Sequence, residues 1–278
     1  MMKAIVLEEN GLKLKEVEIP KLQRNHVLVK IITAALNRRD QWIREGLYPR
    51  IQLPVILGSD ACGIVTEVAE SIDKHWIGKT VVINPNIQWG NNPQIQSKQY
   101  QILGMPTNGT LAEYIIIHTD RLELAPHRLN NESAAALPLA GLTAYNALIN
   151  KGELHSVKKV LISGVGGGGA QFAFQFSLAI GAPTWITSSK ENVLQKCKEL
   201  GAKKGVSYKN PEEIKSLSKS MQGFDVIIDS AGGNGLNTLM ESFAPGGKLI
   251  IYGATMGLSN TLNLRNIFAN QLSLIGNT

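Results

Sequence analysis

The feature that most constrains this chain is a run of glycines between a short apolar segment and a helical pattern. Residues 164–170 read Gly-Val-Gly-Gly-Gly-Gly-Ala and directly follow the strand-like segment around Val160-Leu161-Ile162. Glycines allow a sharp turn from strand to helix and a close approach of the backbone to a pyrophosphate, which the free N–H groups of the helix start can bind. The pattern favours a dinucleotide-binding fold, and a flexible glycine turn without a ligand is the alternative.

Beyond the glycines, strand-like and helix-like segments alternate to the end of the chain. The first helix has apolar residues at the spacing of one buried face, namely Phe172, Phe176, Ala179 and Ile180. The expected strands are 160–163, 184–187, 205–208, 226–229, 248–252 and 272–276, and the expected helices between them are 171–180, 191–200, 211–221 and 236–243. This alternation predicts a parallel sheet with right-handed crossovers.

The first 120 residues have a different, β-rich texture. Runs of β-branched residues bounded by turn residues predict strands at 27–32, 63–68, 81–83 and 114–117. Between them, residues 84–108 are polar and rich in Asn, Gln and Pro, which is typical of a long loop or lobe. Residues 132–148 have a helical pattern with expected interruptions at Pro138 and Gly141. We therefore expect a β-rich domain at 1–125 and an α/β domain at 126–278.

Composition excludes several classes of protein. A chain of 278 residues with 44% hydrophobic and 18% charged residues is globular and long enough for about two domains. Its net charge of +6 comes from scattered basic pairs, so we expect no nucleic-acid partner. Residues 160–189 carry no charge, but their glycines, Gln171 and Pro183 argue against a membrane span. Two cysteines, Cys62 and Cys197, cannot form a disulfide framework, which favours a cytoplasmic location.

The end of the second strand bears on the choice of dinucleotide. A carboxylate at this point would hold the ribose 2′-hydroxyl of NAD, whereas Thr187 is followed here by Ser188-Ser189-Lys190. Small hydroxyls beside a lysine suit a 2′-phosphate, so we expect NADPH as cofactor. Two structural explanations stay open, because Ser188 with Glu191 also matches a capping box and Lys190 also suits a solvated first helical turn.

Several short motifs occur in a fixed order along the chain: Ala35-Leu36-Asn37-Arg38-Arg39-Asp40, Gly58–Gly63, Asn108–Tyr114, Leu139–Tyr145, the glycine loop and Asp229–Gly233. Together they resemble the medium-chain dehydrogenase/reductase family, in particular its zinc-independent quinone-reductase and enoyl-reductase-like branch. The resemblance covers the whole chain. It implies an α/β protein with a GroES-like β-rich catalytic domain, a Rossmann domain with a doubly wound parallel sheet, and an active cleft between them.

The resemblance also implies which residues carry the chemistry. It places Asn37, Asp40 and Tyr48 at the cleft as the expected catalytic residues. Asn37 would donate to a developing oxyanion, and Tyr48 would stack on a flat substrate or donate its hydroxyl. The alternative is that Asn37 and Asp40 form a structural turn and that Tyr48 only packs. The expected cofactor-binding residues are Thr143, near the nicotinamide, and Gly164, Gly166, Gly167, Gly168, Gly169, Ala170, Ser188, Ser189, Lys190, Gly232 and Gly253.

Zinc-dependent members of the family use a Cys at the position of Asn37 and a His-Glu pair at the positions of Ser59-Asp60. One carboxylate cannot hold a catalytic zinc ion, which needs about three protein ligands. Residues 84–108 correspond to the family's structural-zinc loop but contain no Cys. We therefore expect no metal, and an NADPH-dependent reduction of a quinone or an α,β-unsaturated carbonyl, over which the developing charge is spread.

Family members continue beyond the strand at 272–276 with a segment that completes the catalytic domain, whereas this sequence ends at Thr278. The resemblance therefore leaves a second hypothesis open: a nucleotide-binding redox sensor or scaffold with little or no turnover. The last strand is expected at a sheet edge, where it could pair with a second copy. We accordingly expect a homodimer or self-association.

Overall fold

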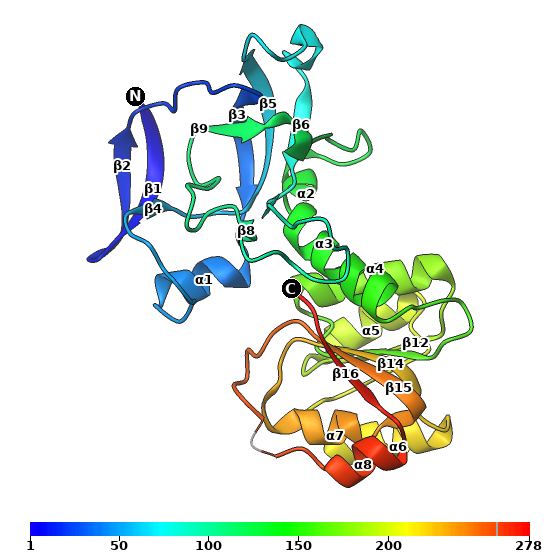
Figure 1. Cartoon of the computed structure of the whole chain (residues 1–278). Helices are drawn as coiled ribbons and strands as arrows, with labels where there is room; N and C mark the ends of the chain where they lie inside the picture. The colour runs from blue at the N-terminus through cyan, green and yellow to red at the C-terminus, as the bar shows by residue number, and fades with distance from the viewer. Residues whose placement is uncertain (260) are drawn as a thin grey trace. The chain divides into compact units, whose positions relative to one another are not determined.

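The computed structural model describes residues 1–259 and 261–278 of the chain (Figure 1). Two compact units are present, Met1–Leu139 and Ala140–Thr278, and the boundary falls inside a helix, α3 Pro138–Tyr145. Each unit has its own sheet and its own apolar core. In the part of the chain described here, no helix combines the length and the apolar character needed to cross a bilayer.

The N-terminal unit is built on a five-stranded antiparallel sheet with the order β10-β6-β5-β3-β9. Val27, Val29 and Ile115 are buried in the main core of this sheet, whereas Cys62 and Val82 of the same sheet are buried in a second cluster with residues of the helix α2 Asn131–Ala135. The strands predicted at 27–32, 63–68, 81–83 and 114–117 are confirmed. The strand bounds are β3 His26–Ala35, β5 Asp60–Val68, β6 Thr80–Ile83, β9 Tyr114–His118 and β10 Leu122–Leu124.

Shorter elements surround this sheet. Residues 84–108, here called the lobe, form mostly irregular structure, as predicted, with one small pair of strands. The helix α1 Arg38–Arg44 follows β3 directly and was not predicted from the sequence. The remaining elements are β1 Met2–Glu8, β2 Gly11–Val17, β4 Val55–Ile56, β7 Asn86–Ile87, β8 Gln101–Ile102, α2 Asn131–Ala135 and the 3-10 turns Lys74–Trp76 and Thr119–Arg121.

The helical segment near the unit boundary is interrupted once rather than twice. α2 ends before Pro138 and α3 begins there, as predicted. The interruption predicted at Gly141 is wrong, because α3 runs through this residue and continues as a π-helical segment, Asn146–Lys151. Gly141 is buried, so tertiary packing outweighs the cost of about 1 kcal/mol that glycine imposes on a helix.

The C-terminal unit contains a six-stranded parallel sheet with the order β13-β12-β11-β14-β15-β16. In chain order this is 3-2-1-4-5-6, the doubly wound arrangement of a Rossmann fold. Helices lie on both faces of the sheet (Figure 1), and the buried apolar residues form two separate clusters. The bounds are β11 Val160–Ile162, α4 Gly168–Ile180, β12 Thr184–Thr187, α5 Glu191–Glu199, β13 Lys204–Val206, α6 Pro211–Ser220, β14 Phe224–Asp229, the 3-10 turn Gly233–Gly235, α7 Leu236–Met240, β15 Phe243–Ile251, α8 Leu264–Ala269 and β16 Ser273–Gly276.

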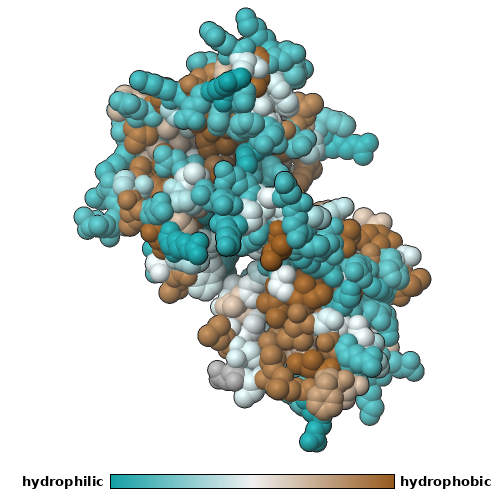
Figure 2. Space-filling view, viewed as in Figure 1, coloured by the Kyte–Doolittle hydropathy of each residue, from teal (hydrophilic) through white to brown (hydrophobic). Residues whose placement is uncertain are grey.

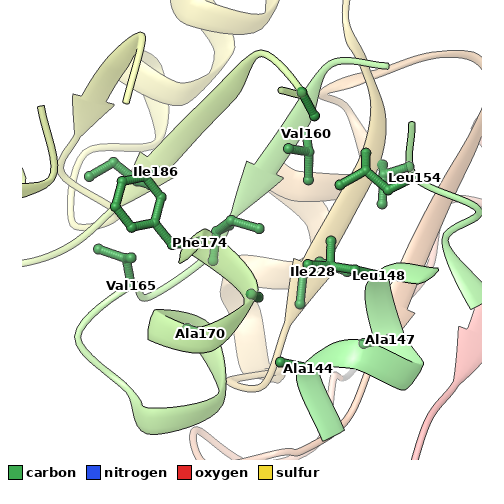
Figure 3. Packing of buried hydrophobic residues seen from close by; sticks show 14 of the residues in the cluster. Ala144, Ala147, Leu148, Leu154, Val160, Val165, Ala170, Phe174, Ile186 and Ile228 are labelled. Carbon is green, nitrogen blue, oxygen red and sulfur yellow. The ribbon is translucent and has the colours of Figure 1, made fainter. Parts of the chain in front are cut away.

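The face that α4 turns toward the sheet differs from the prediction. Its buried residues are Ala170, Ala173, Phe174 and Ser177, whereas Phe172, Phe176 and Ile180 are only partly buried and Ala179 is exposed. Figure 3 shows Ala170 and Phe174 packed among Val160, Ile186 and Ile228. Three small side chains and Phe174 form this contact, and the small ones let the helix approach the sheet closely, so that Phe172 and Phe176 flank the contact.

The last strand lies where it was predicted, at the edge of the parallel sheet. β16 pairs with β15 on one side and has no other partner among the described residues. Apolar side chains also gather on the C-terminal unit in Figure 2, and the exposed apolar residues of this unit include Met256, Leu258, Leu264 and Phe268. Pairing of this edge with a second copy stays a prediction.

Candidate active site

The glycine loop lies at the carboxyl end of β11, in the middle of the parallel sheet. Gly164 has a φ of +62°, and its N–H group donates to Thr187 Oγ1 at 3.0 Å, which ties the loop to the end of β12. The first hydrogen bond of α4 runs from Gln171 N to Gly167 O at 2.8 Å. The N–H groups of residues 168–170 therefore stand at the helix start without helical partners, where an anion can accept them.

The three glycines of the G-x-G-x-x-G pattern have different surroundings. At Gly169, an added Cβ would lie 3.1 Å from the Tyr252 ring, so a side chain there would press on this tyrosine. At Gly166, an added Cβ would meet no heavy atom within 4 Å, and the backbone there does not adopt a positive φ. Nothing in the surrounding protein therefore explains why residue 166 is a glycine. The dinucleotide-binding pattern assigns this glycine to the close approach of a pyrophosphate, and that contact stays a prediction.

The predicted 2′-phosphate site follows β12. Ser189 and Lys190 are exposed, and Ser189 Oγ accepts a hydrogen bond from Tyr208 Oη at 2.9 Å. Ser188 is buried, and its Oγ accepts from Lys190 N at 3.2 Å. The capping-box alternative for Ser188 and Glu191 is wrong, because Lys190 is the residue that precedes the first turn of α5.

The other predicted cofactor residues have structural roles of their own. An added Cβ at Gly232, where φ is +63°, would lie 2.9 Å from Gly257 O, and one at Gly253 would lie 2.8 Å from Ser230 O. These glycines therefore permit close backbone packing whether or not a nucleotide is bound. Thr143 is half-buried on α3, and its carbonyl oxygen accepts from Asn277 Nδ2 at 3.1 Å. Their contacts with a cofactor stay a prediction.

In the N-terminal unit, Asn37 and Asp60 form a hydrogen-bonded pair. Antiparallel pairing of β3 with β5 sets Ala35 opposite Asp60, which brings the start of α1 beside this carboxylate. Asn37 Nδ2 donates to Asp60 Oδ2 at 2.9 Å, and Leu139 N donates to Asp60 Oδ1 at 2.9 Å. Asp60 is 1% exposed, and this burial raises its pKa to about 7.

Asp40 serves the backbone around it. Its Oδ2 accepts from Asn37 N at 2.7 Å and its Oδ1 from Gly58 N at 3.2 Å, so one carboxylate joins the start of α1 to the turn before β5. The side chain is 6% exposed, and burial raises the pKa of Asp40. These contacts are the ones expected if Asp40 belongs to a structural turn. Asn37 and Tyr48, in contrast, are partly exposed.

The side chain of Arg39 is 8% exposed and lies among polar groups of three segments. Its Nη1 donates to Ser59 Oγ at 3.1 Å and to Leu103 O at 3.0 Å, and its Nη2 donates to Ile102 O at 3.0 Å and Met105 O at 2.7 Å. Its Nε donates to Tyr48 Oη at 3.3 Å. Asn37, Arg39, Asp40, Tyr48, Ser59 and Asp60 are called the polar cluster below.

Sequence reasoning missed the roles of four residues. Arg39 was considered only as half of a basic pair and Asp60 only as a replaced zinc ligand, because their partners come from distant parts of the chain. Tyr208 and Tyr252 each come shortly after a strand of the parallel sheet, and the glycine loop also follows a strand of this sheet. All three therefore lie at the carboxyl ends of the strands. That position after a strand was the signal that could have indicated them.

Comparison with known proteins identifies the family. Residues 23–127 match the model described as alcohol dehydrogenase GroES-like domain, and residues 164–278 match the one described as zinc-binding dehydrogenase. The zinc-type alcohol dehydrogenase-like protein YogA of Leptosphaeria maculans is 34% identical over 262 residues, which span 88% of this chain and 73% of that protein. The chain belongs to the medium-chain dehydrogenase/reductase family.

Two further comparisons agree. The zinc-type alcohol dehydrogenase-like protein C1773.06c of Schizosaccharomyces pombe is 35% identical over 270 residues, 94% of this chain and 78% of that protein. A crystal structure of an NAD-dependent alcohol dehydrogenase superposes with a TM-score of 0.93 and 32% identity, covering all of this chain and 84% of the other. The resemblance and the GroES-like plus Rossmann fold are thus confirmed, and the protein is an oxidoreductase of this family.

The raised pKa of Asp60 predicts a pH-dependent stability. A carboxyl whose folded-state pKa is about 7, against an ordinary value of 3.8, loses stabilising free energy as pH rises between these two values. Relative to Asp60→Asn, the wild-type protein should therefore lose about 2–3 kcal/mol of unfolding free energy between pH 5 and pH 8. Urea unfolding at both pH values measures this difference.

Asp225→Asn is the matched control for this experiment. Its carboxylate also accepts a backbone N–H group, from Lys159 at 2.7 Å, but lies in the other unit. This variant shows how the loss of a hydrogen-bonded carboxylate outside the polar cluster affects the same measurement. A constant difference between wild type and Asp60→Asn over the same pH range would contradict the assigned burial of an ionisable Asp60.

The glycine loop generates a second prediction. Gly166→Ala should leave the free energy of unfolding unchanged within about 0.5 kcal/mol, because the added Cβ meets no protein atom. It should weaken nucleotide binding by about tenfold or more, because the Cβ occupies the path of the pyrophosphate. Gly169→Ala, whose Cβ would press on Tyr252, should instead lower stability. Thermal unfolding and nucleotide titration separate the two effects, and unchanged binding by Gly166→Ala would place the pyrophosphate elsewhere.

Proposed function

We propose that the protein transfers hydride from NADPH to a quinone or an α,β-unsaturated carbonyl without a catalytic metal ion. One observation carries this proposal: the positions that the family resemblance assigns to zinc ligands hold side chains bonded to other protein groups. Asn37 is bonded to Asp60, and Ser59 is bonded to Arg39. The polar cluster therefore offers hydrogen-bond donors, rather than an open set of ligands, to a substrate oxygen.

The side chains at positions 37, 59 and 60 do not fit a zinc ion, although two relatives are named zinc-type proteins and one matching family model is described as zinc-binding dehydrogenase. Zinc sites in proteins use thiolate, imidazole and carboxylate ligands, and Asn37 and Ser59 provide none of these. Ser59 Oγ donates to Leu103 O at 2.7 Å and accepts from the Arg39 guanidinium, whose charge repels a cation. Among the residues that the structure describes, no group of three or more His, Cys, Asp or Glu side chains could hold a metal ion.

The residues present can serve a reduction in which negative charge develops on an oxygen. When bound, NADPH supplies a hydride to the electrophilic carbon of the acceptor and leaves as NADP⁺, so that an electron pair collects on the acceptor's oxygen until a proton arrives. Asn37 keeps one amide N–H free after its bond to Asp60 and can donate it to that oxygen. Tyr48 supplies a hydroxyl and an aromatic face for a flat acceptor. Quinones and enones suit such a site because their charge is delocalised.

NADPH, rather than NADH, is the cofactor that the loop after β12 favours. Ser189 and Lys190 are exposed there, and Tyr208 adds a third polar group beside Ser189. The run from Thr187 to Lys190 contains no carboxylate to accept the 2′-hydroxyl of NAD. The related crystal structure carries the name of an NAD-dependent enzyme. The preference of this chain for NADPH over NADH therefore has to be measured on this chain itself.

Lys190→Ala tests the cofactor preference. Loss of a charge-assisted contact with the 2′-phosphate should weaken NADPH binding by about ten- to a hundredfold and leave NADH binding nearly unchanged. Lys198→Ala, in the last turn of the same helix, removes the same charge and should affect neither. Fluorescence titration of the wild-type protein and both variants with each nucleotide gives the six affinities. If the wild-type protein binds NADPH and NADH equally, the assignment of the loop to a 2′-phosphate fails.

The function itself is tested by NADPH oxidation in the presence of EDTA, with quinones, enones, aldehydes and simple alcohols or their ketones compared as substrates. We expect turnover with the first two classes, no effect of the chelator, and a loss of about a hundredfold for Tyr48→Phe at saturating NADPH. Loss of turnover in EDTA that zinc restores would contradict the metal-free proposal. NADPH binding without turnover of any acceptor would instead favour the sensor or scaffold hypothesis.

A further inference from the structure

Arg39 has a role that the function proposed above does not yet use. A guanidinium group has five N–H donors, and here each has an acceptor: Tyr48 Oη, Ser59 Oγ and the carbonyl oxygens of residues 102, 103 and 105. None of these acceptors is a carboxylate. The buried positive charge is therefore fully hydrogen-bonded, yet no described residue forms an ion pair with it.

The acids near Arg39 are engaged elsewhere. Asp40 follows it in the chain and interacts with its charge, but both oxygens of Asp40 accept backbone N–H groups. Asp60 is occupied by Asn37 and Leu139. The guanidinium thus remains available to attract negative charge that develops beside it. Such attraction is strong where water is excluded.

The contact with Tyr48 fixes the direction of a hydroxyl proton. Because Arg39 Nε–H donates to Tyr48 Oη at 3.3 Å, one lone pair of the phenol oxygen is used and the O–H group must donate elsewhere. The guanidinium carbon also lies 5.0 Å from the centre of the Tyr48 ring. The ring packs against an apolar cluster of Leu7, Ile43, Val55, Leu57 and Met105. Its position is therefore set from two sides.

The remaining four donors of Arg39 explain why the guanidinium itself is held in place. Two of them reach Ile102 and Met105, one reaches Leu103, and all three carbonyls belong to the lobe. The fourth reaches Ser59, at the turn into β5. The planar group is thus anchored by its Nη atoms, which leaves Nε directed at Tyr48.

We propose that Arg39 is a positioning residue: it orients Tyr48 so that the phenol donates a hydrogen bond, and then its proton, to the oxygen of the reduced acceptor. In that step the O–H bond of Tyr48 breaks, an O–H bond forms on the acceptor, and the negative charge passes to the phenolate beside the guanidinium. Water then returns a proton to Tyr48. The inference rests on the proposed function, in which Tyr48 contacts the acceptor.

A double-mutant cycle tests this role. Arg39→Lys keeps the positive charge and can still donate to lobe carbonyls, but it lacks the Nε donor. With quinone as acceptor, Arg39→Lys should lower kcat by roughly tenfold without changing NADPH affinity. In a Tyr48→Phe background the same substitution should lower kcat by about twofold or less, because the residue acts through the phenol. Arg44→Lys, on the exposed side of α1, is the matched control and should have no effect.

A second readout does not depend on turnover. The chain has six tyrosines, and the ¹⁹F resonance of Tyr48 in 3-fluorotyrosine-labelled protein is the one that Tyr48→Phe removes. Without any cofactor, this resonance should move in Arg39→Lys and stay in place in Arg44→Lys. The other five resonances report whether the fold is intact. If Arg39→Lys does not fold, Arg39→Gln, which keeps two N–H donors for the lobe, replaces it.

The outcomes separate the two proposals. Equal losses of kcat in the wild-type and Tyr48→Phe backgrounds would show that Arg39 is only structural, and would overturn this inference while the proposed function stands. Absence of any quinone or enone turnover would overturn the proposed function. In that case the fluorine resonance still tests the role of Arg39. A Tyr48 signal that moves in Arg39→Lys supports the contact between Arg39 Nε and Tyr48 Oη, and a signal that does not move overturns the inference.

Discussion

The polar cluster of the N-terminal unit depends on how two buried ionisable groups, Arg39 and Asp60, are hydrogen-bonded without pairing with each other. An unpaired charge in a protein interior is costly unless hydrogen bonds replace those it made with water. Arg39 meets this requirement through carbonyl and hydroxyl oxygens of distant segments, and Asp60 through the Asn37 amide and the Leu139 N–H group. The start of β5, the start of α1, the lobe and the first turn of α3 must therefore converge on one place.

In the C-terminal unit, the corresponding constraint is room for a ligand at the carboxyl ends of parallel strands. Gly164 adopts the positive φ of the turn, and an added Cβ at Gly169 would press on Tyr252, whereas one at Gly166 would meet no protein atom within 4 Å. The protein therefore leaves open space at residue 166, where the dinucleotide-binding pattern predicts a pyrophosphate. The strand order 3-2-1-4-5-6 places this loop on the central strand, next to the end of β12.

Much of this fold could be predicted from the sequence, because the strands are β-branched runs and the glycine loop has a recognisable context. The same local patterns could not show which face of α4 is buried, since that depends on the closeness of helix and sheet. They also could not show that Gly141 stays helical, because burial decides it. The three carbonyl partners of Arg39 lie more than 60 positions away along the chain, so that only the folded lobe brings them to it. Asn37 and Tyr48 were found through motif resemblance rather than through chemistry visible in the residues.

The interlocked bonding of the polar cluster also limits how this lineage can change. A single substitution of Asn37 by a thiol ligand would leave Asp60 without its amide donor. A histidine at position 59 would remove the hydroxyl that Arg39 now donates to and would place an imidazole beside a guanidinium. Each step toward a metal site would therefore pass through a less stable intermediate sequence. Several changes would have to be made together before this cluster could offer the three protein ligands that a catalytic zinc ion needs.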